Sequence, residues 1–355
     1  MAQTDNHLVI MAGGVGSRFW PMSTAERPKQ FIDVLGVGRT LIQLTYNRFA
    51  DVVSPDNVWV VTNQKYVALV HEQLPEIPLN HILSEPCRRN TAPCIAYVSW
   101  RIKKENPKAN IVVSPSDHIV ANDTEFRRVI TNCLKFTAET DAVVTLGMKP
   151  TRPETGYGYI QADLSTASAR NREIYRVDQF REKPDLHTAE QYIKQNNFFW
   201  NAGIFIWSAS TIVNAFRIYQ PSIARIFERI MDVLGTIDEQ RFIDEVYPEC
   251  ENISVDYAIM EKAEEIFVCP ADFGWSDLGT WGSLLAHTRH DIYGNAVIGN
   301  DVHLFDSKNC IVHTTEERKV VIQGLDGYIV AEQDGKLLIC RLTEEQRLKQ
   351  FTGEG

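Results

Sequence analysis

Apolar and polar positions alternate regularly over the first 150 residues of the 355-residue chain. Five short runs are apolar almost throughout, and such runs predict strands buried on both faces. They are LVIMA (8–12), VWVVT (58–62), HILS (81–84), NIVVS (110–114) and AVVTLGM (142–148). Between them, apolar residues recur at helical spacing in residues 40–52, 64–74, 91–105 and 124–139. Buried strands alternating with amphipathic helices predict a doubly wound α/β domain.

The regular alternation ends near residue 150. From 151 to about 288 aromatic residues gather in three stretches, which predicts an insertion that builds a substrate pocket. They are ETGYGYI (154–160), NNFFWNAGIFIW (196–207) and FGWSDLGTW (273–281). From about 289 onward, short β-like runs replace the helical periodicity. There Ile292, Ile298, Leu304 and Cys310 recur every six residues, a spacing that suggests a coil of a β-helix.

Composition narrows the function classes. Hydrophobic residues make up 44% of the chain and charged residues 23%, as in ordinary globular proteins. The net charge of −10 argues against a general binder of nucleic acid or of anionic membranes, and we expect neither as a partner. The chain begins without the basic start and apolar run of a signal peptide. Seven cysteines without a C-x-x-C pair disfavour a disulfide framework and a zinc site, so we expect a reducing, cytoplasmic compartment.

A glycine-rich stretch, MAGGVGSRFWPMSTAERPKQF (11–31), follows the first predicted strand. Glycine turns in this position often hold phosphates, because their backbone N–H groups can approach an anion closely. A dinucleotide fingerprint does not fit, since Phe19 stands where its third glycine would be. A Walker A loop does not fit either, because no Lys-Ser or Lys-Thr follows the glycines. A purely structural turn remains an alternative at this point.

Two cations follow these glycines. Arg18 offers a planar fork and Lys29 a compact charge, and both suit a triphosphate. The pattern GGVGSRFWPMS…RPKQF resembles the signature of the nucleotidyltransferases that make nucleotide-sugars, G-x-G-x-R-x-x-P-[LM]-[ST]…P-K. With Trp20 and Gln30 in place, it is particularly similar to the mannose-1-phosphate guanylyltransferases, or GDP-mannose pyrophosphorylases.

The resemblance extends in order from residue 8 to about 288 and implies a domain organisation. The fold implied is a Rossmann-like, doubly wound mixed sheet, the nucleotide-diphospho-sugar transferase fold. Residues 1–288 would form the catalytic domain, with a nucleotide-binding part to about 150 and a sugar-phosphate part over about 151–288. Residues 289–355 lie beyond the resemblance; their β-like runs predict a small β-rich domain, for which a left-handed β-helix is one interpretation, and we expect it to serve as a dimerisation element. We therefore expect a homodimer.

The same resemblance implies the roles of the residues in the glycine-rich stretch. Arg18 and Lys29 would be catalytic, stabilising charge on the α-phosphate and on the leaving pyrophosphate. Four small residues would bring the backbone close to the nucleotide: Ala12, Gly13, Gly14 and Gly16.

SEPCRRNTAPCIA (84–96) runs from a predicted strand end into a helix. One interpretation is purely structural, with Asn90 as helix N-cap and Pro93 in the first turn. The segment also resembles the part of the guanylyltransferases that reads the base. Guanine presents N–H donors that a carboxylate or a carbonyl accepts, so Glu85 and Asn90 are the candidates.

Two aspartates are candidate ligands of Mg²⁺. Asp117 in VVSPSDHIV lies just past the end of a central predicted strand, where open α/β sheets bind ligands, and Asp277 in FGWSDLGTW precedes a predicted helix. In isolation the first is a turn former and the second an N-cap. The resemblance makes both of them metal ligands, and carboxylates with phosphate oxygens suit Mg²⁺. We expect His118 to be a structural neighbour.

The sugar-phosphate half of the site is implied by three further segments, ETGYGYI, FREKPD (180–185) and FWNAGIFIW. Its candidate residues are Gly156, Glu182, Lys183 and Asn201. Glu182 would accept hydrogen bonds from sugar hydroxyls, Lys183 would pair with the sugar phosphate, and Asn201 would reach a hydroxyl. Asp256 in SVDYAIMEKA is either structural or close to the sugar.

The reaction implied is attack by mannose 1-phosphate on the α-phosphorus of GTP, with release of pyrophosphate. Thymidylyl or cytidylyl transfer to glucose 1-phosphate is a rival that SEPCRRNTAP and RFWPMS…RPKQF disfavour. A non-catalytic sensor of nucleotide-sugars is a rival of another class, disfavoured because both cations and both aspartates are present. Some relatives append a phosphomannose isomerase domain. Since this sequence stops at Gly355, we expect it to be monofunctional.

Overall fold

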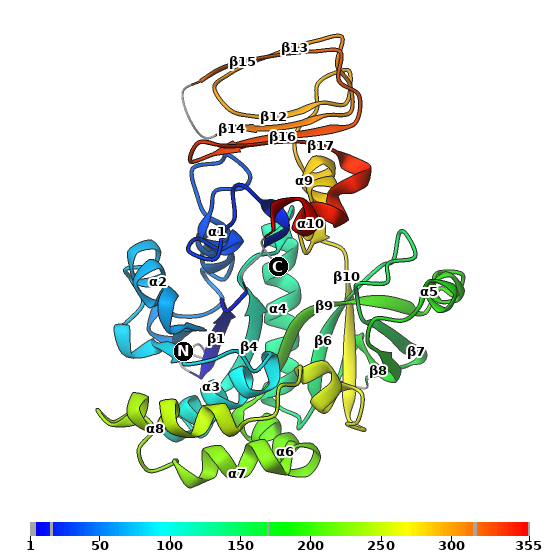
Figure 1. Ribbon diagram of the computed structural model, residues 1–355. Coiled ribbons are helices and arrows are strands. Elements are labelled where there is room, and N and C mark those ends of the chain that lie inside the picture. Colours follow the sequence, from blue (N-terminus) through cyan, green and yellow to red (C-terminus); the bar gives the residue numbers. More distant parts are fainter. Residues whose placement is uncertain (1–4, 15–16, 169, 315–317, 354–355) are drawn as a thin grey trace. The chain divides into compact units, whose positions relative to one another are not determined.

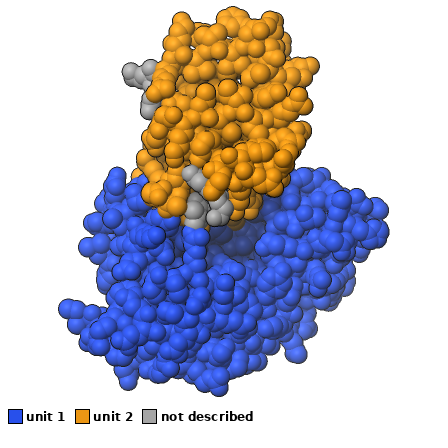
Figure 2. Space-filling model, viewed as in Figure 1, with its two compact units in different colours: residues 1–13, 46–115, 120–275 blue, residues 14–45, 116–119, 276–355 orange. Residues whose placement is uncertain are grey.

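The structure is a computed structural model that describes residues 5–14, 17–168, 170–314 and 318–353. The chain forms two compact units (Figure 2). Unit 1 comprises residues 1–13, 46–115 and 120–275, and unit 2 comprises residues 14–45, 116–119 and 276–355. Unit 2 thus draws on three separate parts of the sequence. The expected domain boundary near residue 288 stays a prediction.

Unit 1 is built on a nine-stranded mixed sheet with the order β3-β2-β1-β4-β9-β6-β10-β8-β7 (Figure 1). Its strands are β1 (Asn6–Met11), β2 (Val58–Asn63), β3 (Ile82–Glu85), β4 (Asn110–Pro115), β6 (Val143–Met148), β7 (Tyr159–Ser168), β8 (Asn171–Arg181), β9 (Phe198–Ser208) and β10 (Ile266–Ala271). Strands β1 to β4 pair in parallel, as do β6 and β10. β9 inserts antiparallel between β4 and β6. The predicted α/β class and mixed sheet are confirmed.

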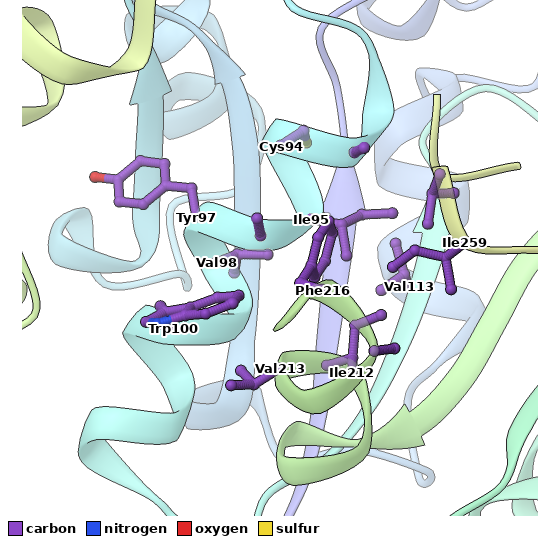
Figure 3. Close-up of a cluster of buried hydrophobic side chains, with 14 of the residues drawn as sticks. Cys94, Ile95, Tyr97, Val98, Trp100, Val113, Ile212, Val213, Phe216 and Ile259 are labelled. Carbon is purple, nitrogen blue, oxygen red and sulfur yellow. The ribbon is translucent and has the colours of Figure 1, made fainter. Parts of the chain in front are cut away.

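Helices cover both faces of this sheet. They are α2 (Val67–Gln73), α3 (Thr91–Glu105), α4 (Asp123–Ala138), α5 (Leu186–Ile193), α6 (Ala209–Tyr219), α7 (Pro221–Arg229) and α8 (Glu239–Val246), with α1 (Leu41–Arg48) where the units divide. Val9, Ile111 and Val113 belong to one core with residues of α3, α6 and α7. Figure 3 shows Val113 in this core with residues of α3 and α6. The strand neighbours Leu8 and Val112 are equally buried but lie outside that core. Side chains alternate along a strand, so these face the other side, where α4 packs on β4 and β9.

Unit 2 contains parallel coils of strands. β12 (Ala296–Ile298), β14 (Ile311–Thr314) and β16 (Tyr328–Gln333) form one sheet, which antiparallel β17 (Lys336–Arg341) extends, and β13 (Asp301–Phe305) pairs with β15 (Lys319–Gln323). The chain returns to the same sheet after 18 residues, from Ile311 to Ile329 and from Asp301 to Lys319. The expected β-rich C-terminal part is confirmed. The six-residue pattern was wrong at its start, however, because Ile292 precedes the strands and is 90% exposed.

One apolar core joins these coils to the glycine-rich stretch. Its residues are Phe19, Met22, Ile32, Val34, Leu41, Ile119, Leu278, Trp281, Leu284, Ala296, Ile298, Ile311, Ile329, Ala331, Leu338, Cys340 and Leu348. The helical elements around it are η1 (Ser17–Phe19), η2 (Lys29–Phe31), α9 (Trp281–His287), η8 (Leu342–Arg347) and α10 (Leu348–Thr352). Among the described residues, no helix has both the length and the hydropathy needed to cross a membrane.

Candidate functional site

Lys29 is the centre of the polar cluster in unit 2. It lies in η2 and is only 4% exposed. Its ammonium forms an ion pair with Asp117 Oδ2 at 2.9 Å and donates to the backbone carbonyls of Asp277 at 3.0 Å and Leu278 at 2.9 Å. These contacts use the three N–H donors of an ammonium. Lys29 therefore ties together the two segments that carry the predicted metal ligands.

Arg18 reaches the same loop. Its guanidinium Nη1 donates to the carbonyl of Gly279 at 3.2 Å, two residues after Asp277. The Asp277 carboxylate folds back on its own loop and accepts the N–H of Gly279 at 3.1 Å. The structure thus brings Arg18, Lys29, Asp117 and Asp277 together within unit 2, although these residues are far apart in the sequence.

The charge of Lys29 also acts on the carboxyl group of Asp117. Burial by itself would raise the pKa of Asp117, but the Lys29 ammonium and the His118 ring outweigh it, so the pKa lies below its ordinary value. His118 Nε2 is 3.9 Å from Asp117 Oδ1, which agrees with its expected place as a neighbour. Asp117 is consequently an anionic carboxylate at neutral pH.

The carboxylates of this cluster fit a hard divalent cation. Asp117 is about one third exposed at its side chain, at 32%, so ligand and solvent can reach it. Oxygen donors of this kind are the ligands that Mg²⁺ prefers. Within the described ranges, no three His, Cys, Asp or Glu side chains gather as a self-sufficient metal cluster. A metal held by two protein carboxylates needs substrate oxygens or water to complete its shell, which is typical of Mg²⁺ at phosphate sites.

Gln30, to which no role had been assigned from the sequence, hydrogen-bonds to the backbone of the glycine-rich stretch. Gln30 is 1% exposed, and its Nε2 donates to the carbonyl of Gly14 at 2.8 Å. Gly14 itself is exposed. Gly16 lies outside the described residues. Gln30 thus holds the start of the stretch beside Lys29, its neighbour in the sequence.

In unit 1, Glu85 stands at the end of β3, paired with Asn63 at the end of β2. It is 8% exposed and accepts a hydrogen bond at Oε1 from the hydroxyl of Tyr247. Burial raises the pKa of Glu85 to about 7, and the Tyr247 hydrogen bond offsets only part of that effect. A Cβ atom at Gly13 would come within 3.3 Å of Glu85 Oε2. Glycine therefore lets the backbone after β1 approach this carboxylate.

The other two residues predicted to bind the nucleotide in unit 1 have clear structural roles. Asn90 is the N-cap of α3, and its Oδ1 accepts the N–H of Thr91 at 3.0 Å. Its φ of 65° is an uncommon conformation for a residue with a side chain. Ala12 continues from β1, donating its N–H to Val61 and accepting from the Thr62 hydroxyl.

Glu182 and Lys183 follow β8. Glu182 is 8% exposed and pairs with Lys183 Nζ at 2.7 Å, while the Lys183 side chain is 56% exposed. Lys183 has a φ of 45°. This backbone conformation costs free energy in a residue with a side chain, and residues in such conformations are concentrated at functional sites. A Cβ at Gly158 would meet Glu182 Oε2 at 2.5 Å and Asn201 Cβ at 3.3 Å. Gly158 thus lets both Glu182 and Asn201 approach the same backbone segment closely.

Asn201 is part of a hydrogen-bonded chain that includes Asp256. Its Oδ1 accepts from the Thr145 hydroxyl at 3.0 Å and from the Gly203 N–H at 3.1 Å, and its Nδ2 donates to Asp256 Oδ1 at 2.9 Å. Burial, followed by the charge of Glu182, raises the pKa of Asp256 to about 7. Asp256 therefore belongs to the same cluster as the predicted sugar residues, a placement that the sequence left undecided.

Aromatic side chains gather near Gly156. The Gly156 N–H donates to Glu154 Oε1 at 3.1 Å. The adjacent Tyr157 ring packs edge-on against Trp200 at 5.3 Å and Trp275 at 5.4 Å between centroids. The sequence pointed to this cluster through its aromatic crowding, but the individual contacts could not be read from it.

The family model of nucleotidyl transferases matches residues 7–292. The chain belongs to this family. It is 36% identical over 351 residues to mannose-1-phosphate guanylyltransferase 2 of Escherichia coli O157:H7, covering 97% of this chain and 72% of that protein. It is also 36% identical over 349 residues to alginate biosynthesis protein AlgA of Pseudomonas fluorescens, covering 97% and 70%. A solved structure from Thermus thermophilus, described as a mannose-1-phosphate geranyltransferase, matches with a TM-score of 0.86 at 32% identity over 98% of both chains.

These relatives confirm the resemblance stated from the sequence, and the nucleotidyl transferase described here is an enzyme. Nucleotidyltransferases generally use a divalent metal, which agrees with the carboxylate of Asp117 held by Lys29. The family match ends at residue 292. The apolar core beside the polar cluster of unit 2 also includes residues of strands beyond that point, such as Ile311 and Ile329.

Proposed function

We propose that this nucleotidyl transferase transfers GMP from GTP to mannose 1-phosphate, giving GDP-mannose and pyrophosphate. Relatives named as mannose-1-phosphate guanylyltransferases over nearly the whole chain support this proposal. The observation that carries it is the cluster in unit 2, where Lys29 joins Asp117 to the loop of Asp277 and Arg18 contacts that same loop. Two cations and two carboxylates in one place are what nucleotidyl transfer between two anions requires.

The nucleophile needs little activation. The second pKa of a phosphate monoester is about 6, so an oxygen of mannose 1-phosphate is already anionic at neutral pH and no general base is required. The chemical problem is the repulsion between two anions and their in-line approach. Arg18 would donate to the α-phosphate and the leaving pyrophosphate. Lys29 would hold the Asp117 carboxylate and the backbone of the Asp277 loop in position and reduce the negative charge around them.

Asp117 and Asp277 would hold Mg²⁺, which when bound supplies Lewis-acid stabilisation of phosphate oxygens. Backbone N–H groups of Gly14 and Gly16 would approach the triphosphate, with the Gly14 segment kept in place by Gln30. Removing one preorganised donor of this type typically lowers turnover by about 10²–10³, so these groups have large expected effects.

Unit 1 carries the groups that would select the substrates. In its deprotonated form, Glu85 would accept the N1–H and N2–H groups of guanine, with Gly13, Ala12 and Asn90 forming the adjacent backbone. Among the predicted sugar residues, Lys183 would pair with the phosphate of mannose 1-phosphate, since its side chain is 56% exposed whereas that of Glu182 is 7% exposed. The remaining sugar-binding groups would be Gly156, Glu182 and Asn201.

A matrix of four nucleoside triphosphates against mannose, glucose and fucose 1-phosphates tests this function. Pyrophosphate release and the nucleotide-sugar product are measured in each combination with Mg²⁺. GTP with mannose 1-phosphate should give the highest kcat/KM. A maximum with dTTP or CTP and glucose 1-phosphate would favour the rival transferase, and GTP binding without pyrophosphate release would favour a sensor.

We further propose a cytoplasmic homodimer that acts on small molecules. The apolar side chains of Leu337 and Ile339 on β17 are 59% and 57% exposed, and this edge strand of unit 2 supports a subunit interface. Free rather than disulfide-paired cysteines, seven in all, support a reducing compartment.

A further inference from the structure

The segment that follows the last strand contacts the start of α9. Glu345 in η8 accepts the N–H of Gly282 at its Oε2, at 2.8 Å. Gly282 is the second residue of α9, where backbone N–H groups have no partner within the helix. Thr280 and Ser283 form a capping box at the same helix end. Backbone N–H groups in the first turn of α9 therefore have two kinds of partner. One is the capping box, and the other is a carboxylate from the C-terminal segment.

Glycine at position 282 leaves room for the close approach of Glu345. A Cβ atom at position 282 would lie 3.3 Å from Glu345 Oε1 and 3.6 Å from Oε2. The carboxylate also stands at the positive end of the α9 dipole, which favours it. Both features indicate a specific contact and not a chance approach of two surface groups.

The helix end held by Glu345 directly follows the loop that receives both cations. The carbonyls of Asp277 and Leu278 accept from Lys29, and the carbonyl of Gly279 accepts from Arg18. Leu278 has a φ of 48° and is fully buried, so the loop has one strained, well-defined conformation. Any shift of the first turn of α9 moves these three carbonyls.

A second contact links the C-terminal segment to Phe19, the neighbour of Arg18 in the sequence. Leu348 in α10 is 1% exposed and shares the apolar core with Phe19 and Trp281. The rings of Phe19 and Trp281 are 5.3 Å apart between centroids. Phe19 is the residue after Arg18 and the last of η1, so the packing of α10 also fixes the end of η1.

We propose that Glu345 is a positioning residue for nucleotidyl transfer, acting through α9 on the loop that orients Lys29, Arg18 and Asp277. This inference rests on the proposed function. Glu345 need not touch either substrate. Through Glu345, the residues beyond position 292 contribute to catalysis, apart from any part they have in subunit association.

The test compares E345A and E345Q with the matched controls E344A and E344Q. Glu344 has the same charge and lies next to Glu345, but it pairs with Arg347 within η8. For each variant we would measure kcat and KM for both substrates by pyrophosphate release. The Kd of GTP without sugar phosphate and the thermal unfolding midpoint are measured alongside.

We expect E345A to lower kcat/KM for GTP about tenfold, the effect of losing roughly one hydrogen bond to a charged group. E345Q keeps an acceptor oxygen, so its loss should be about threefold. The KM of mannose 1-phosphate should stay within about twofold, and both Glu344 variants should behave as wild type.

Lower thermal stability of E345A with unchanged kinetic constants and GTP affinity would overturn the proposal, as would equal losses in the Glu344 variants. If E345A does not fold, the kinetic constants and GTP affinities of E345Q and E344Q are compared instead, and unchanged values in E345Q would overturn the proposal. A wild-type protein that forms no GDP-mannose would instead refute the proposed function. The GTP affinities would then still show whether Glu345 positions the loop.

Discussion

Replacing Lys29 by methionine is the most informative single perturbation of unit 2. Methionine keeps an unbranched apolar stem of similar length and removes the ammonium. The change eliminates one ion pair, to Asp117, and two hydrogen bonds, to the carbonyls of Asp277 and Leu278. The contacts that join the two aspartate segments are lost together, so stability and activity should both fall.

The size of the stability effect follows from burial. Removing one partner of a fully buried ion pair costs about 3–5 kcal/mol. The Asp117 side chain is 32% exposed, so water screens part of the charge left behind. We therefore expect the free energy of unfolding to fall by about 2–3 kcal/mol. Activity should fall further, by about 10²–10³ in kcat, as for the loss of a preorganised charge in a transferase site.

Two assays measure these effects. Urea unfolding at neutral pH without divalent metal gives the free energy of unfolding, and pyrophosphate release with saturating GTP and mannose 1-phosphate gives kcat. Lys135→Met is the control, because Lys135 is an exposed lysine of α4 in unit 1. A Lys29→Met protein with wild-type kcat would refute the reasoning. So would a fall in the free energy of unfolding no larger than that of the control.

Three further predictions follow from the other contacts. Burial raises the pKa of Glu85 to about 7, so the folded protein keeps a proton that the unfolded chain loses. Wild-type stability should therefore decline by up to roughly 3 kcal/mol between pH 5 and 8 relative to Glu85→Gln, as measured by urea unfolding; parallel curves would contradict this. Gln30→Leu removes the donor to the Gly14 carbonyl and should raise the KM of GTP about tenfold, whereas an unchanged KM would show that this anchor does not matter. Lys183→Met should raise the KM of mannose 1-phosphate about tenfold or more and leave the Kd of GTP unchanged, and a change confined to GTP would contradict its assignment.

The pattern of apolar and polar residues was sufficient to predict most strands of the sheet. The five predicted strands correspond to β1, β2, β3, β4 and β6, because a buried parallel strand imposes a continuous apolar run on its own residues. The position of β9 between β4 and β6 was not predictable in this way. Its sequence, FFWNAGIFIWS, shows that it is buried, but strand order depends on pairing between distant residues.

The C-terminal coils show a similar limit. The β character of the region was clear, yet Ile292 fits the six-residue spacing and is exposed. A period read from four residues fixes neither the start of a coil nor its length. The paired residues, such as Ile311 with Ile329, define both.

The sequence predicted which residues form the candidate site, but not the contacts between them. The motif indicated which side chains carry charge, and the structure brings Arg18, Lys29, Asp117 and Asp277 together in unit 2. Side chain–backbone contacts leave no signature in a motif, however. That the Lys29 ammonium is held by two carbonyls besides Asp117 could only be seen in the structure. The same holds for the Gln30 contact with Gly14 and for Asp256 beside Asn201.

The central claim is that mannose 1-phosphate attacks the α-phosphorus of GTP. Parallel reactions with GTP radiolabelled at the α- or at the γ-phosphate test this directly, with separation of the nucleotide-sugar, pyrophosphate and inorganic phosphate. The α label should appear in GDP-mannose and the γ label in pyrophosphate, in equal amounts. Label from the γ-phosphate in inorganic phosphate or on the sugar, with no α label in a nucleotide-sugar, would contradict the account.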